Sequence, residues 1–260
     1  MRLLILLVLL LCSGSPAVAW TVRGHAIVAL IAERHLSPRA EAAVQELLAS
    51  EGKTSLTAVS SWADHMRHVK NPRQPSHAVY LDGGNTPYNP ARHCKRDRCI
   101  LAAIDSNVET LRNPSAPREA RVAALKYLVH FIGDLHMPMH ATRLGRGLKV
   151  VYNGKEVTLH KVWDTDVIAS QKGGVRAIAD LVEATATPYK RGPFTPVEWA
   201  LEGRDIARDV IMPSLPPTAE GEIAVLPPSY TLEYWPIARE RLNLAGRRLA
   251  DLLNDIFSRG

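Results

Sequence analysis

The sequence predicts an all-α fold, in which a single, mainly helical domain carries one small β-hairpin. Apolar residues recur every three or four positions along most of the 260-residue chain, which is the period of a helix with one buried face. Strand-like alternation is confined to residues 149–159, around the turn pair Asn153-Gly154. Proline is frequent, and the prolines fall between the helical patterns and not in one run.

Each element follows from local signals. Ile27, Leu30 and Ile31 mark the first helix, and Ser37-Pro38 opens the second. Residues 71–98, rich in Pro, Gly and Asn, predict a long ordered loop. Beyond the first, helices are expected over residues 38–48, 56–66, 100–111, 117–137, 160–169, 176–184, 196–212 and 232–257.

The first nineteen residues have the pattern of a cleaved signal peptide. Arg2 precedes an apolar run over residues 3–11, and the stretch closes on the small-residue site Ala17-Val18-Ala19. The run is too short to span a bilayer, so no membrane anchor is expected. We therefore expect a secreted or periplasmic protein, cleaved between Ala19 and Trp20, whose residues 20–260 form one domain. Cleavage would free the α-amino group of Trp20, five residues before His25.

Cysteine usage and charge agree with that location. Outside the signal only Cys94 and Cys99 remain, and an oxidising compartment favours a disulfide between them over two free thiols. The formal net charge of +6 falls to +5 when Arg2 is lost. This modest balance favours contact with polyanions such as nucleic acid or phospholipid headgroups, without choosing between them.

Two pairs of His and Asp residues have the spacing of helical metal ligands. His130 and Asp134 are four residues apart, as are His160 and Asp164, so each pair projects from one helix face. His140 follows Pro138, where the chain can turn back towards the same site. A single such pair is commonly a surface hydrogen bond. Two pairs, one of them among apolar neighbours that bury it, favour metal binding.

Further candidates lie upstream. Asp64 precedes Arg67 by one helical turn, and His77 adds an imidazole from the loop. The remaining histidines have no comparable partner pattern. His35, His65, His68 and His93 are expected at the surface, and His136 has no assigned role.

Taken together, these residues resemble the S1/P1 nuclease family, which shares its fold with the zinc-dependent phospholipases C. The matching motifs run in family order over more than half of the chain after Trp20, and the Cys94/Cys99 pair also fits. They are Trp20 with Gly24-His25, Ser61-Trp62-Ala63-Asp64 with Arg67, His77, His130-x3-Asp134-x5-His140 and His160-x3-Asp164.

The resemblance implies three zinc ions and a ligand set for each. The first would take Asp64, His77, His130 and Asp134. The second would take the amine and carbonyl of Trp20, with His25 and Asp134 as a bridge. The third would take His140, His160 and Asp164. These donors suit zinc, which binds imidazole and carboxylate.

The resemblance also implies an activity: endonuclease cleavage of single-stranded DNA or RNA to 5′-phosphate products, with hydrolysis of 3′-nucleotides. Asp64 would orient the attacking water and Arg67 would stabilise charge on the phosphate. Where the family's fungal members place an aromatic residue and a base-contacting residue, this chain has Ala78 and Tyr80. Tyr80 would then stack on the base, or Asp82 would supply the polar contact. A monomer is expected.

Two alternatives remain at this point. One is a zinc-dependent phospholipase C with the same metal core, although those enzymes carry Glu where this chain has Asp164. The other is a secreted, non-catalytic protein that binds nucleic acid and uses zinc structurally. Structural zinc sites are normally closed and often rich in Cys, whereas this donor set is rich in His and Asp, which favours catalysis.

Overall fold

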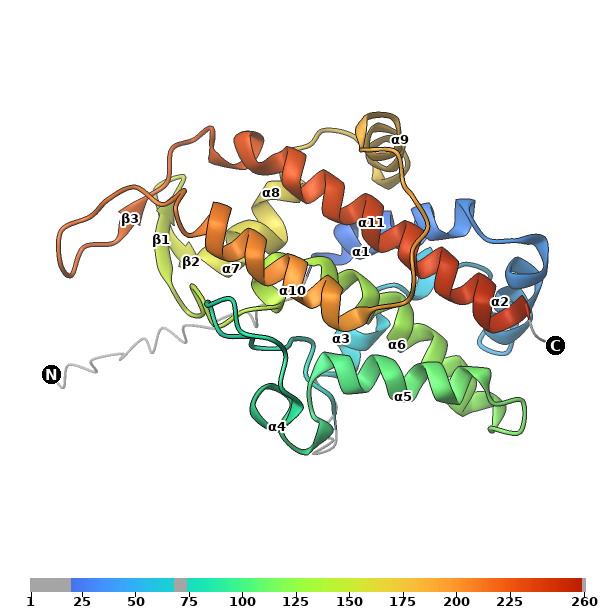
Figure 1. The fold of residues 1–260 in the computed structure, drawn as a ribbon. Helices are drawn as coiled ribbons and strands as arrows, with labels where there is room; N and C mark the ends of the chain where they lie inside the picture. The colour runs from blue at the N-terminus through green and yellow to red at the C-terminus, as the bar shows by residue number, and fades with distance from the viewer. Residues whose placement is uncertain (1–19, 68–73, 259–260) are drawn as a thin grey trace, which may run out of the picture.

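The computed structural model describes residues 20–67 and 74–258, and it confirms the mainly helical class (Figure 1). The predicted signal peptide, residues 1–19, and His68 lie outside the described residues. The α-helices are α1 (Val22–Arg34), α2 (Pro38–Ala49), α3 (Trp62–Met66), α4 (Pro90–His93), α5 (Ile100–Arg112), α6 (Arg118–His136), α7 (Leu159–Lys161), α8 (Val167–Ala169), α9 (Val175–Thr185), α10 (Pro196–Ile206) and α11 (Tyr230–Ser258).

Helix α6 is the central element, and it positions most of the site. It packs against α5 on one side and against α1, α10 and α11 on others. Every residue from Leu128 to His136 is buried, so the end of the helix is enclosed on all faces. Polar side chains on these last two and a half turns cannot reach water and must find partners inside the protein.

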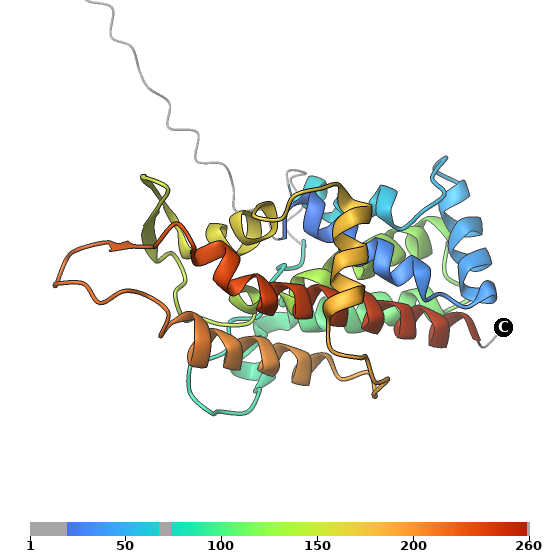
Figure 2. The ribbon, with the colours of Figure 1, turned by 90° about the horizontal axis from the view of Figure 1, so that it is seen from above.

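The N-terminal helix is held against α6 by the longest helix. Figure 1 shows α11 running in front of α1, and the two are in direct contact. Their close approach needs Gly246, because a Cβ there would lie 2.6 Å from the Cβ of Ile31. Helix α9 crosses both at a steep angle, which Figure 2 shows from above. This arrangement fixes α1, and with it His25, beside α6.

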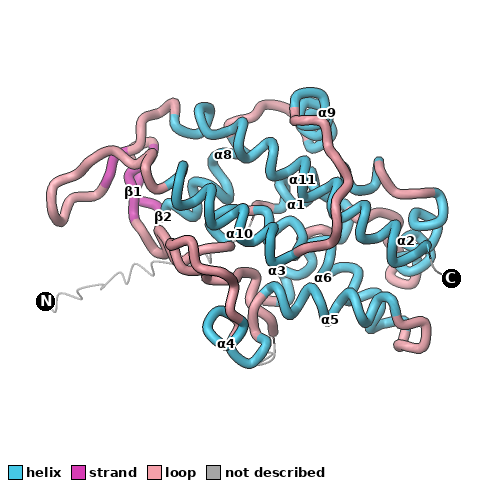
Figure 3. The backbone as a smooth tube through the Cα atoms, viewed as in Figure 1, coloured by secondary structure: helices cyan, strands magenta, loops and turns pink. Residues whose placement is uncertain are grey.

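The sheet is small and lies at one end of the helices (Figure 3). Strands β1 (Lys149–Tyr152) and β2 (Lys155–Thr158) pair antiparallel, as the sequence predicts. Asn153 and Gly154 make the turn with φ of 49° and 73°, the left-handed conformation that a two-residue hairpin requires. A third strand, β3 (Ala224–Val225), pairs parallel to β1 and was not predicted, because two residues carry no alternation to detect.

Two segments and one proline differ from expectation. Pro236 lies inside α11 and not between helices. Residues 56–66 do not form one helix: a 3₁₀ turn at Thr57–Val59 is followed, after Ser60 and Ser61, by α3. The break places the Ser60 carbonyl where it accepts a hydrogen bond from a buried imidazole, described below. The predicted loop over residues 71–98 contains α4 and a 3₁₀ turn at Lys95–Asp97, both too short to give a periodic signal.

Candidate metal centre

The end of α6 carries two of the predicted ligands side by side. His130 and Asp134 are fully buried, and His130 Nε2 lies 3.2 Å from Asp134 Oδ2. This is the helical i, i+4 contact that the spacing predicts. The pair is therefore an internal feature of the fold and not a surface hydrogen bond.

Three other elements converge on this pair. From α1, His25 Nε2 lies 3.2 Å from Asp134 Oδ1. From the loop before α4, His77 Nδ1 lies 2.9 Å from Asp134 Oδ2. From α3, Asp64 Oδ1 lies 3.6 Å from His130 Nε2 and 3.7 Å from His77 Nδ1. Three imidazoles and a second carboxylate thus surround the Asp134 carboxylate.

A second group forms one side of the same region. His140 Nε2 and His160 Nε2 lie 3.1 Å apart, and His160 Nε2 is 3.0 Å from Asp164 Oδ2. The His140 ring also lies near the first group, with its Nδ1 3.7 Å from Asp134 Oδ1. Three sets of donor atoms are each compact enough to hold one metal ion: His25, Asp64 and His130; His77, His130 and Asp134; and His140, His160 and Asp164.

Hydrogen bonds to backbone carbonyls fix which ring nitrogens are available. His130 Nδ1 donates to the Ser60 carbonyl at 2.8 Å, and His140 Nδ1 donates to the His77 carbonyl at 2.9 Å. In each neutral ring the lone pair is then on Nε2, which faces other imidazoles and carboxylates. Second partners of this kind orient metal-binding histidines.

Several buried polar atoms in the region are not satisfied by protein groups. Asp64 Oδ2 and Asp164 Oδ1 are buried, and neither has a hydrogen-bond partner among the described residues. A buried carboxylate oxygen without a partner costs free energy of about 1–3 kcal/mol. The donor set, made of imidazole and carboxylate, fits a zinc ion, which would satisfy these atoms.

The electrostatics of the side chains alone are strongly perturbed. Burial would lower the pKa of His130, but the Asp134 and Asp64 carboxylates outweigh it and raise this pKa to about 10. Burial lowers the pKa of His140 to about 3, and burial raises the pKa of Asp164 to about 6 against the attraction of His160. Titratable groups displaced in opposite directions within one cluster are typical of a functional site.

Trp20 lies against this region. It is buried, and the amide of the next residue, Thr21, donates to the Asp164 carbonyl at 3.2 Å. A Cβ on Gly24 would lie 3.1 Å from the Trp20 side chain, so the indole packs tightly over the first turn of α1. The backbone of Trp20 is therefore next to the segment that carries Asp164.

Gly133 was missed by the sequence analysis. A Cβ at this position would lie 2.9 Å from His25 Nδ1, so the glycine lets α1 bring its imidazole against α6. The available signal was a glycine inside a strongly helical pattern, where it costs about 1 kcal/mol relative to alanine.

The site opens into a pocket of about 250 Å³. Arg67 stands at its edge, with Nη1 3.4 Å from Asp64 Oδ1. The pocket brings together cationic, aromatic and imidazole side chains from five segments of the chain. Its lining consists of Arg67, Ser76, His77, Ala78, Tyr80, His140, Arg146, Gly147, Thr158 and His160.

The two candidate base contacts are placed differently. Tyr80 lines the pocket and is half-buried. Asp82 is not part of the pocket lining, and its Oδ2 lies 2.9 Å from Arg92 Nε and 3.0 Å from His93 Nε2. The Asp82 carboxylate is thus already engaged by protein cations and a ring N–H. Of the two candidates, the geometry therefore favours Tyr80 over Asp82 as a contact for a ligand in the pocket.

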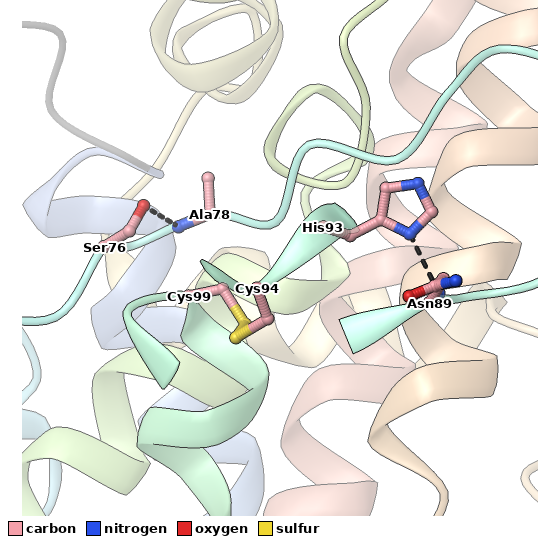
Figure 4. Close-up of a disulfide and its surroundings, with 6 residues drawn as sticks. All are labelled: Ser76, Ala78, Asn89, His93, Cys94 and Cys99. Carbon is pink, nitrogen blue, oxygen red and sulfur yellow. Dashed lines mark hydrogen bonds between the residues drawn. A yellow bond between two sulfur atoms is a disulfide. The ribbon is translucent and has the colours of Figure 1, made fainter. Parts of the chain in front are cut away.

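Two of the histidines expected at the surface are not there. His93 is buried, and its Nδ1 accepts from the Asn89 amide at 3.0 Å while its Nε2 faces Asp82 (Figure 4). His35 is half-buried, with its Nε2 2.6 Å from Glu183 Oε1. His65 is exposed as expected. Both departures arise because a hydrogen-bonded partner from another segment compensates the burial, which the local sequence does not reveal.

His136 has a structural role. It is buried, its Nδ1 donates to the Ile132 carbonyl at 2.7 Å, and its Nε2 accepts from Arg248 Nη1 at 2.9 Å. Burial, together with the nearby Arg241 and Arg248 cations, holds its pKa well below the usual range. His136 therefore supports the contact between α6 and α11 as a neutral ring.

The disulfide predicted from the cysteine count is present. Cys94 and Cys99 are bonded and close a short loop at the start of α5 (Figure 4). The same view shows Ser76 and Ala78 on the neighbouring part of the loop, where the Ala78 amide donates to Ser76 Oγ at 3.2 Å. The Ile100 amide donates to the Ala78 carbonyl at 3.3 Å. The crosslinked segment thus holds the part of the loop that carries His77.

Fold and site together define a mainly helical protein whose buried His and Asp clusters can bind metal at the floor of a pocket. Comparison with known proteins identifies the class further. The family described as S1/P1 Nuclease matches residues 20–258, and the chain belongs to that family. A nuclease is a hydrolase that acts on phosphodiester bonds, and family membership supports this activity over the phospholipase and the non-catalytic alternatives.

Individual relatives agree. The chain is 27% identical to Nuclease PA3 of Penicillium sp and 27% identical to Nuclease P1 of Penicillium citrinum, in each case over 91% of this chain and 97% of the relative. It is 28% identical to Endonuclease 2 of Arabidopsis thaliana, over 98% of this chain and 96% of the relative.

Across residues 20–67 and 74–258, none of the helices has the length and apolar character needed to cross a bilayer.

Proposed function

We propose that this protein is a secreted or periplasmic, zinc-dependent endonuclease that cleaves single-stranded DNA or RNA to 5′-phosphate products and also hydrolyses 3′-nucleotides. The observation that carries the proposal is the convergence of imidazoles and carboxylates from separate segments on the floor of one pocket that also contains Arg67. We further propose that it acts as a monomer with residues 20–260 as one catalytic domain.

The proposed zinc ligands are Trp20, His25, Asp64, His77, His130, Asp134, His140, His160 and Asp164, which would hold three ions. Asp134 would be shared, since both of its oxygens face imidazoles from different segments. When bound, zinc supplies Lewis acidity and makes hydroxide available near neutral pH.

The chain's own residues supply position and charge. Arg67 is exposed at the pocket edge, where its guanidinium can bind a phosphate oxygen and stabilise negative charge that develops during hydrolysis. Asp64 lies between Arg67 and the imidazoles, and its Oδ2 accepts no hydrogen bond from the described residues. We propose that the Asp64 carboxylate, through the oxygen that is not used as a metal ligand, accepts a hydrogen bond from the attacking water and so orients it.

The size of the pocket, about 250 Å³, supports the preference for single strands that we propose. A base must leave its stack to enter, which costs little in a single strand and more in a duplex. Tyr80, in the lining, offers an aromatic ring for stacking.

The test is incubation of processed protein with single-stranded and duplex oligonucleotides of one sequence, with chelator and after zinc is restored. We expect cleavage of the single strand, loss on chelation, recovery with zinc, and 5′-phosphate ends by product mapping. Binding without cleavage in excess zinc would contradict an enzymatic role.

A matched pair of variants separates the site from general charge effects. Asp164→Asn should lower zinc content and activity together, because Asp164 is buried in the second cluster. Asp166→Asn should change neither by more than about twofold, because Asp166 pairs with Lys161 at 3.1 Å on the partly exposed side of the same turn. Equal loss in the two variants would argue against the assigned ligand set.

A further inference from the structure

A second arginine lines the pocket, and the proposed hydrolysis does not use it. The Arg146 guanidinium lies over the Tyr80 ring, 4.4 Å from its centroid. The residue is exposed, and among the described residues its side chain makes no ion pair and no hydrogen bond beyond this stacking contact. Its N–H groups are therefore available to a ligand in the pocket.

The backbone presents Arg146 to the pocket through a tight turn. Gly145 and Gly147 flank it with φ of 63° and 75°, and the Arg146 amide donates to the Arg143 carbonyl at 3.2 Å. A side chain at either glycine would strain this turn. The position of Arg146 over Tyr80 is thus set by a turn that the two flanking glycines favour.

The chemistry of the pair differs from that of a bare aromatic platform. The guanidinium lies over one face of Tyr80, and a guanidinium plane is itself a surface on which a base can stack. Around its edge, arginine carries only donors and no acceptor. A base next to this edge therefore makes the strongest hydrogen bonds if it offers two acceptors side by side.

Resting on the proposed function, we propose that Arg146 is a specificity-determining residue that binds the edge of the substrate base and favours guanine over adenine. Guanine presents O6 and N7 as adjacent acceptors, whereas adenine presents N7 beside an amino donor. The same reasoning favours cytosine, with N3 and O2 adjacent, over uracil. Within each pair the bases have equal ring size, so the comparison isolates the edge contact.

The experiment compares kcat/KM for the 3′-phosphates of guanosine, adenosine, cytidine and uridine in the wild type, Arg146→Met and Arg146→Lys. Methionine keeps a long side chain without donors. We expect a guanine preference of at least about fivefold in the wild type, since a bidentate pair discriminates by about 1–3 kcal/mol. Arg146→Met should abolish the guanine preference, and Arg146→Lys should retain only part of it, because an ammonium lacks the forked geometry of a guanidinium.

Arg143→Met is the matched control. Arg143 is also an exposed arginine of the same turn, but it is not part of the pocket lining and its Nε faces Asp82 at 3.7 Å. Arg143→Met removes the same charge and should leave the guanine-to-adenine ratio of kcat/KM unchanged. If this ratio falls equally in Arg143→Met and Arg146→Met, the effect comes from overall charge and the proposal is overturned.

Two further measurements separate the other outcomes. Adding a 5′-phosphate to each substrate tests whether Arg146 binds phosphate: a change in the bisphosphate-to-monophosphate ratio in Arg146→Met, with the base ratio unaffected, would overturn base reading. Equilibrium binding of guanosine and adenosine to zinc-loaded protein needs no hydrolysis. If no substrate is hydrolysed, the proposed function fails, while tighter guanosine binding that depends on Arg146 would still support this inference.

Discussion

Substitution of Gly133 by alanine tests the placement of α1 against α6 more directly than removal of a ligand. A Cβ at this position would lie 2.9 Å from His25 Nδ1 and 3.2 Å from its Cε1. The imidazole has little room to yield, because its ring is stacked on His130 at 3.8 Å between centroids and both residues are fully buried. Gly133→Ala must therefore displace His25 or separate the two helices.

Two opposing effects set the change in the free energy of unfolding that Gly133→Ala causes. Alanine in the middle of a helix gains about 1 kcal/mol over glycine, whereas overpacking a well-packed core costs about 1–3 kcal/mol. We expect a net loss of about 0–2 kcal/mol in the free energy of unfolding, which corresponds to a fall in Tm of up to about 8 °C for a domain of this size. Displacing His25, a proposed ligand, should weaken zinc binding by about 10- to 100-fold.

Unfolding of chelator-treated protein measures the first effect, and zinc competition against a chromophoric chelator measures the second. The decisive control is a double-mutant cycle with His25→Ala. Once the imidazole is absent the added methyl has space, so in that background Gly133→Ala should stabilise the protein by about 1 kcal/mol. If Gly133→Ala has the same sign in both backgrounds, or if zinc affinity is unchanged, the packing argument is wrong.

Three further predictions concern other parts of the molecule. Asp64→Asn should lower kcat by at least about tenfold with little change in KM, because the role that we propose for Asp64 is to orient water and not to bind substrate; a rise in KM alone would argue against that role. Protein that retains Ala19 before Trp20 should bind less zinc and lose activity relative to the processed form, since an acylated amine is no ligand; metal analysis of both forms checks this, and equal zinc content would count against Trp20 as a ligand. Glu202 accepts from Arg241 at 2.7 Å and from Arg248 at 2.8 Å; burial would raise its pKa, but these arginines outweigh that and lower it. A carboxylate with a lowered pKa stabilises the fold above its unfolded pKa of about 4.5, and this contribution is lost as the pH falls through the folded pKa. Glu202→Gln should therefore lower the free energy of unfolding by about 1–2 kcal/mol at pH 7, after allowance for partial exposure. In denaturant titrations, the difference in this free energy between the variant and the wild type should narrow below pH 4.5.

The sequence by itself determined the helical class, the hairpin and the identity of the candidate ligands. Periodicity over long segments is set by which face of each helix is buried, and this can be read locally. The i, i+4 spacing likewise placed His130 beside Asp134 and His160 beside Asp164 without knowledge of the rest of the fold. The disulfide followed from the cysteine count and the expected compartment.

Only the tertiary structure decided how these pieces meet. The contact of His25 with Asp134 depends on Gly133, and the orientation of the His130 ring depends on the Ser60 carbonyl at a break that helical periodicity concealed. His93 is buried because Asp82 faces it, and Arg146 is in the pocket because a turn of flanking glycines puts it over Tyr80. Each of these contacts joins residues that helical or strand periodicity does not relate. Their free energy depends on distance and burial in three dimensions, which no local pattern of residues encodes.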